Sequence, residues 1–110
     1  MAMISTVIAL ALAAAPAQAS DTTRSAREAF TACLRAFVES SIQGGKSAEA
    51  FTAEYAQQCT TQEQAFRDAV IRRDTANRST RASAEESANL EVQDARVNFS
   101  ERFEMSMAPQ

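Results

Sequence analysis

Two cysteines are the residues whose spacing points most directly to chemistry, since the chain contains only these two. Cys33 lies twelve residues before Gly45, and Cys59 lies fourteen residues after it. If helices flank a turn at Gly44–Gly45, these offsets correspond to about 18 and 21 Å along the two helices. The difference of about 3 Å is small beside the Cα separation of about 4.4–6.8 Å that a disulfide allows. We therefore predict a disulfide between Cys33 and Cys59 across an antiparallel helical hairpin.

A redox-active pair is the functional alternative for these cysteines. Catalytic redox cysteines usually stand close together, as in a C-x-x-C motif, whereas Cys33 and Cys59 are far apart in the sequence. A structural crosslink fits this spacing better. Closing a loop of about 25 residues restricts the unfolded chain by about 3–4 kcal/mol, which matters in a domain this small.

Carboxylates form a second candidate group, composed of Glu85, Glu86, Glu91 and Asp94. Paired carboxylates serve acid–base chemistry or bind hard cations. The simpler interpretation is that Glu85 and Glu86 offset the positive end of a helix and that the others are solvated, and we favour it.

Arginines form a third group, a possible basic patch composed of Arg72, Arg73, Arg78 and Arg81. Such a patch suits an acidic partner or an anionic polymer. The alternative, which we favour, is that Arg72 and Arg73 complement the C-terminal end of a helix while Arg78 and Arg81 solvate a loop.

The composition argues against most enzyme classes. The chain has no histidine, and paired cysteines leave no thiolate nucleophile or soft metal ligand. Its net charge of −3 is also unlike the basic excess of nucleic-acid-binding proteins. We expect no catalytic site, no cofactor and no metal, and no nucleic-acid partner.

Residues 1–19 have the pattern of a cleavable signal peptide. An apolar run from Ile4 to Ala15 is too short to span a bilayer and precedes the small-x-small sequence Ala17-Gln18-Ala19. We predict cleavage between Ala19 and Ser20, export to the periplasm or the medium, and no stable membrane anchor after cleavage. The run lacks a preceding Lys or Arg, so either the α-amino group of Met1 suffices or translation starts upstream.

Residues 20–110 predict a single helical domain, because apolar side chains recur at the helical period in three segments. The expected helices cover about 21–43, 47–74 and 83–105. Ser25 with Glu28 and Ser83 with Glu86 resemble capping boxes, and Gly44–Gly45 ends the first helix. Thr60-Thr-Gln-Glu63 is another capping-box pattern, which would break the second helix after Cys59. The apolar stripe of this segment, however, keeps the helical period on both sides of Cys59, so we prefer one helix. The stripes are Ala26, Phe30, Cys33, Leu34, Phe37, Val38 and Ile42; Phe51, Tyr55, Cys59, Gln62, Phe66, Ala69 and Val70; and Ala84, Ala88, Val92, Ala95, Phe99 and Phe103.

The expected fold is therefore all-α, a three-helix bundle-like domain with a disulfide-linked antiparallel helical hairpin after a cleavable signal peptide. Leu90 and Val97, seven residues apart beside the third stripe, form a possible exposed apolar patch. We expect a non-enzymatic periplasmic or secreted interaction or structural module whose partner is a protein. The alternative is a periplasmic chaperone-like or carrier protein that binds an apolar ligand or partner helix in a groove between the third helix and the hairpin.

Overall fold

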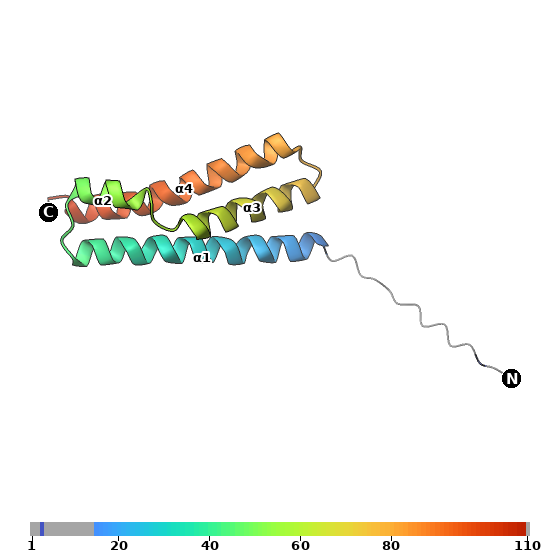
Figure 1. Cartoon of the computed structure of the whole chain (residues 1–110), viewed down its shortest axis with the longest axis horizontal. Coiled ribbons are helices and arrows are strands. Elements are labelled where there is room, and N and C mark those ends of the chain that lie inside the picture. Colours follow the sequence, from blue (N-terminus) through green and yellow to red (C-terminus); the bar gives the residue numbers. More distant parts are fainter. Residues whose placement is uncertain (1–2, 4–14, 110) are drawn as a thin grey trace.

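The computed structural model describes residue 3 and residues 15–109, and this part of the chain is all-α (Figure 1). Within it, four helices follow one another without a strand: α1 (Ala15–Gln43), α2 (Ala48–Tyr55), α3 (Thr60–Ala76) and α4 (Arg81–Met107). The predicted all-α class and helical hairpin are confirmed, with four helices in place of three. The predicted signal peptide falls largely outside the described residues, and the expected cleavage bond between Ala19 and Ser20 falls within α1.

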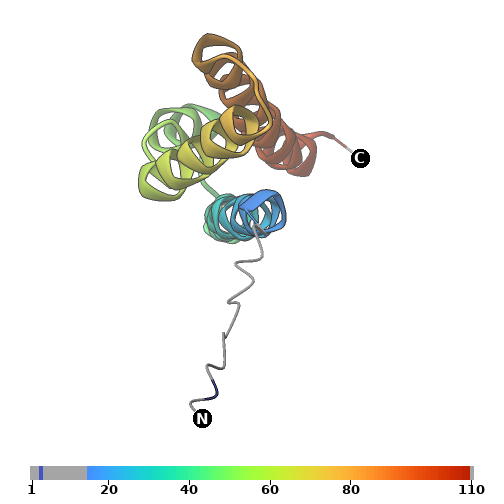
Figure 2. The ribbon, with the colours of Figure 1, turned by 90° about the vertical axis from the view of Figure 1, so that its right-hand side faces the viewer.

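The three long helices α1, α3 and α4 pack against one another. Helices α2 and α3 follow each other antiparallel to α1, and α4 returns antiparallel to α3 (Figures 1 and 2). The C-terminal end of α4 therefore lies beside α2, at the opposite end of the bundle from the start of α1.

The core forms where the predicted apolar stripes meet. Most stripe residues are buried or partly buried, with the exception of Ile42, which is exposed. Two polar side chains join the core: Thr23 donates to the carbonyl of Ala69 at 3.3 Å, and Ser41 donates to the carbonyl of Phe37 at 2.8 Å. The buried apolar side chains are Phe30, Leu34, Val38, Phe51, Tyr55, Cys59, Phe66, Ala69, Val70, Ile71, Ala84, Ala88, Val92, Phe99 and Phe103.

The turn between α1 and α2 forms as expected. Gly45 has a φ of +64°, a left-handed conformation that glycine adopts without a steric penalty. The amide of Lys46 then donates to the carbonyl of Ser41 at 3.0 Å, which satisfies the end of α1. Ser47 caps α2, because its hydroxyl accepts from the amide of Ala50 at 3.1 Å.

The prediction of one helix over residues 47–74 is wrong. Helix α2 ends at Tyr55 and α3 begins at Thr60, so the break after Cys59 that the Thr60–Glu63 pattern indicated is present. Cys59 has a φ of 61°, which an α-helix does not accommodate. The crosslink and the long-range contacts described below hold this connection in place, and periodicity alone does not reveal them.

Two predicted capping boxes are also wrong. Thr80, not Ser83, caps α4, because the Thr80 hydroxyl accepts from the amide of Ser83 at 3.1 Å. Ser25 and Glu28 lie inside α1, so their capping-box pattern marks no helix end.

Candidate functional site: an apolar groove between α2 and α4

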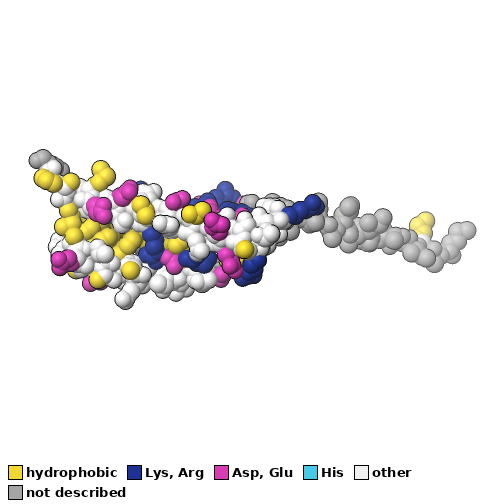
Figure 3. Space-filling view, turned by 90° about the horizontal axis from the view of Figure 1, so that it is seen from above, with side chains coloured by type: hydrophobic (Ala, Val, Ile, Leu, Met, Phe, Trp, Pro, Cys, Tyr) yellow, Lys and Arg dark blue, Asp and Glu magenta, His cyan; other side chains and the backbone are white. Residues whose placement is uncertain are grey.

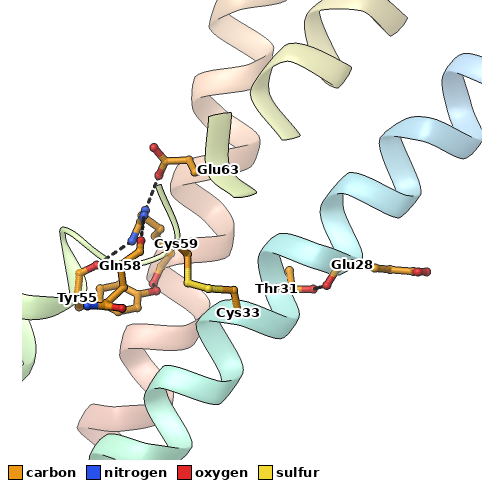
Figure 4. Close-up of a disulfide and its surroundings, with 8 residues drawn as sticks. Glu28, Thr31, Cys33, Tyr55, Gln58, Cys59 and Glu63 are labelled. Carbon is orange, nitrogen blue, oxygen red and sulfur yellow. Dashed lines mark hydrogen bonds and ion pairs between the residues drawn. A yellow bond between two sulfur atoms is a disulfide. The ribbon is translucent and has the colours of Figure 1, made fainter. Parts of the chain in front are cut away.

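The crosslink joins α1 to the connection between α2 and α3 (Figure 4). The Sγ atoms of Cys33 and Cys59 are 2.01 Å apart, and their Cα atoms are 5.9 Å apart. The predicted link between the two arms of the hairpin is therefore confirmed. It holds Cys59, and with it the start of α3, against the middle of α1.

Arg96 of α4 holds the same connection from the other side. Its Nη1 donates to the carbonyl of Tyr55 at 3.0 Å, and its Nη2 donates to the carbonyl of Gln58 at 2.7 Å. Its Nε forms an ion pair with Glu63 at 2.5 Å. One guanidinium thus joins the last carbonyl of α2, a carbonyl of the connection and a carboxylate in the first turn of α3 (Figure 4).

Tyr55 completes this attachment. Its hydroxyl donates to the carbonyl of Arg96 at 2.6 Å, so the two residues bond in both directions. Burial raises the pKa of Tyr55 to about 12, although the nearby charge of Arg96 acts to lower it. The phenol therefore stays protonated and remains a hydrogen-bond donor at neutral pH.

Aromatic rings join α2 to its neighbours. Phe51 stacks on Phe103 of α4 with 3.9 Å between ring centroids. It also contacts Tyr55, at 4.9 Å, and Phe37 of α1, at 5.7 Å. Of these rings, Phe51, Tyr55 and Phe103 are buried and form the floor of a depression between α2 and α4.

The depression is an open, largely apolar groove with a volume of about 480 Å³. This volume and character match those of sites that bind apolar partners or ligands. Figure 3 shows hydrophobic side chains gathered at this end of the molecule, near the C-terminus. The groove is lined by Ala48, Phe51, Thr52, Tyr55, Ala56, Arg96, Val97, Ser100, Phe103, Glu104 and Met107.

The expected apolar patch is only partly at this site. Leu90 and Val97 are both exposed, at 54% and 45%, but Val97 lines the groove and Leu90 does not. Two turns of α4 separate them, which places Leu90 about 10 Å farther along the helix. Met107, which is 50% exposed, extends the apolar wall toward the end of α4.

The four arginines of the expected basic patch are not all available to a partner. Arg73 pairs with Asp74 at 2.9 Å and with Glu91 at 3.1 Å, and Arg81 pairs with Glu85 at 3.1 Å. Partial burial acts to lower the pKa of Arg73, but its hydrogen bonds and the two carboxylates outweigh this effect and raise it.

The other two arginines of this set, Arg72 and Arg78, are exposed. The partly buried Arg73 thus joins α3 to α4 through Glu91, whereas Arg81 and Glu85 form an exposed pair at the start of α4.

The carboxylate cluster is likewise divided. Glu91 bridges Arg27 of α1, at 3.0 Å, and Arg73 of α3, at 3.1 Å. It lies with Asp94 beside a smaller, more polar cavity of about 350 Å³. Among the described residues, no group of three or more Cys, Asp or Glu side chains is arranged to hold a metal ion.

Comparison with protein-family models, with curated proteins and with solved structures finds no match. In the described part of the chain, no helix has both the length and the apolar character needed to cross a bilayer. The functional argument therefore rests on the chain's own contacts. Sequence reasoning missed Arg96 and Glu104, because nothing in the local pattern of α4 shows which side chains face α2.

Proposed function

We propose that this protein is an exported, non-enzymatic interaction module. Its binding site is the groove between α2 and α4, and its ligand is the apolar face of an amphipathic helical segment from a partner protein. The observation that carries the proposal is the open apolar groove, in which Val97 and Met107 stand exposed above a buried aromatic floor.

The shape of the groove supports a helical ligand. Helix α2 has eight residues, which is about 12 Å or two turns. A partner helix laid along it presents two turns of apolar residues, at the i, i+3, i+4 and i+7 spacing of helix-in-groove recognition. The stacked rings of Phe51 and Phe103 preorganise the floor, so binding does not require the ordering of those side chains.

The export part of the proposal is supported by two features. Residues 1–19 follow the pattern of a signal peptide, and a disulfide persists in the periplasm or outside the cell, where the environment is oxidising. A structure crosslinked between Cys33 and Cys59 is compatible with either compartment.

Binding of an uncharged amphipathic model peptide tests the proposal. The peptide carries one tryptophan on its apolar face, and since this chain has no tryptophan, the emission reports the peptide alone. We expect a blue shift on addition of the folded protein. Val97→Asp places a charge in the groove and should weaken binding by about tenfold, equivalent to about 1.4 kcal/mol.

Leu90→Asp is the matched control, since Leu90 is a similarly exposed apolar residue of α4 outside the groove. It should leave the peptide affinity unchanged, and far-ultraviolet circular dichroism should show that both variants fold. Equal losses in the two variants would contradict the proposed location. A neutral apolar dye that binds in the groove while the peptide does not would show that the ligand is a small molecule, which contradicts the proposed ligand class.

A further inference from the structure

Two acidic side chains near the groove lack ion-pair partners in the described part of the chain, whereas the nearest basic side chains have them. Glu104 lines the groove on α4 and is exposed. Glu49 lies on α2 outside the groove, in a neighbouring shallow depression that shares Ala48 and Thr52 with it. Within the described chain, neither carboxylate takes part in an ion pair, so both face solvent at the edge of an apolar surface.

The neighbouring cations are committed to internal contacts. The three guanidinium nitrogen atoms of Arg96 donate to the carbonyls of Tyr55 and Gln58 and to the carboxylate of Glu63. Lys46 forms an ion pair with Glu54 and lies 4.7 Å from the centroid of the Phe37 ring. A ligand in the groove therefore meets the unpaired carboxylate of Glu104, whereas the nearest cations, Arg96 and Lys46, already have carboxylate partners.

Arg102 lies away from the groove, even though it is on the same part of α4. Its guanidinium is 4.6 Å from the centroid of the Phe99 ring, and Phe99 lines the second cavity on another side of α4. The C-terminal end of α4 adds partial negative charge from its last carbonyls close to Met107. Figure 3 shows acidic side chains around the apolar area at this end of the molecule.

We propose that the helix bound in the groove is cationic, with lysine or arginine residues flanking its apolar face. This inference rests on the proposed function and adds the charge of the partner to it. The apolar floor supplies affinity for the hydrophobic face, while Glu104 and Glu49 select the sign of the flanking charges.

Glu104 contributes more of this selection than Glu49. Glu49 stands in the first turn of α2, where its carboxylate also offsets the partial positive charge of that helix end. Glu104 lies close to the end of α4, where its charge adds to the negative end of the helix. Each exposed ion pair with the ligand changes the affinity by about two- to fivefold, and the effect weakens with added salt.

Two tryptophan-labelled model peptides with the same apolar face test the inference, one flanked by lysines and the other by glutamates. At low ionic strength, we expect the lysine peptide to bind about tenfold more tightly than the glutamate peptide. Raising the salt concentration should reduce this ratio toward one. Glu104→Gln should reduce the ratio by about two- to fivefold, and adding Glu49→Gln should reduce it further.

Glu86→Gln is the matched control, because Glu86 is an exposed carboxylate at the opposite end of α4. It should leave the ratio unchanged. Equal affinity for the two peptides, or a preference for the glutamate peptide, would overturn the inference while leaving the groove as a binding site. Failure of both peptides and of the uncharged peptide to bind would instead overturn the proposed function.

Discussion

Arg96→Met tests how much one long-range side chain stabilises the connection between α2 and α3. Methionine keeps an unbranched apolar stem but lacks the guanidinium, whose central carbon lies 5.5 and 5.3 Å from the ring centroids of Phe30 and Tyr55. The substitution removes these cation–π contacts, the bonds to the carbonyls of Tyr55 and Gln58, and the ion pair with Glu63. The loss therefore concerns polar and cation–π contacts and changes side-chain volume little.

The size of the effect follows from the burial of these bonds. The Arg96 side chain is 18% exposed, so its contacts are shielded but not dry. A hydrogen bond to a charged group contributes about 1.5–3 kcal/mol, and water can reach the carbonyls once the guanidinium is gone. We expect the free energy of unfolding to fall by about 3 kcal/mol, a value between one full bond and the sum of three.

Urea unfolding of the oxidised protein, followed by far-ultraviolet circular dichroism, measures this change. Arg102→Met is the matched control on the same helix, because Arg102 is exposed and its described contact is with the face of Phe99. That contact contributes about 0.5–1 kcal/mol. Two variants with the same small loss would refute the reasoning, because Arg96 would then add nothing beyond a surface arginine.

Two further predictions concern the crosslink and the buried tyrosine. Replacing both Cys33 and Cys59 with serine should lower the free energy of unfolding by about 2–3 kcal/mol in urea titrations. A crosslink over a 26-residue separation contributes about 3.5 kcal/mol, and relief of the left-handed conformation of Cys59 recovers about 1 kcal/mol of this. An unchanged midpoint would show that the crosslink is dispensable. Tyr55 is the only tyrosine, so phenolate absorbance should titrate near pH 12 in the folded chain and near pH 10 in urea. Because the folded pKa is raised, its stabilisation is complete below pH 10 and is lost as the pH rises toward 12. Tyr55→Phe should abolish that decline, and a folded-state titration near pH 10 would contradict the burial argument.

Much of the fold was predictable because its signals are local. Apolar residues at the helical period locate the faces of α1, α3 and α4, and Gly44–Gly45 marks the end of α1. The pairing of Cys33 with Cys59 followed from their distances to that turn. Helix starts were less predictable, because Thr80 and Ser83 are both good capping residues and only the geometry selects Thr80.

The site itself was only partly predictable. Val97 could be identified as an apolar residue beside the buried stripe of α4, but its position over α2 depends on the break at residues 56–59. Arg96, which contacts that break, is 41 residues from Tyr55 in the sequence. A contact between residues so far apart in the sequence cannot be detected from the periodicity of the apolar residues.

The relative sizes of the competing effects indicate what keeps the groove open. Joining α2 to α3 as one helix would relieve the left-handed conformation of Cys59, which is worth about 1–2 kcal/mol. It would also remove the carbonyls of Tyr55 and Gln58 from Arg96, and each of these bonds to a charged group contributes about 1.5–3 kcal/mol. The contacts of Arg96 therefore outweigh the strain at Cys59. The crosslink to Cys33 holds the same connection from the side of α1, so Arg96 and the crosslink together maintain the shape of the groove.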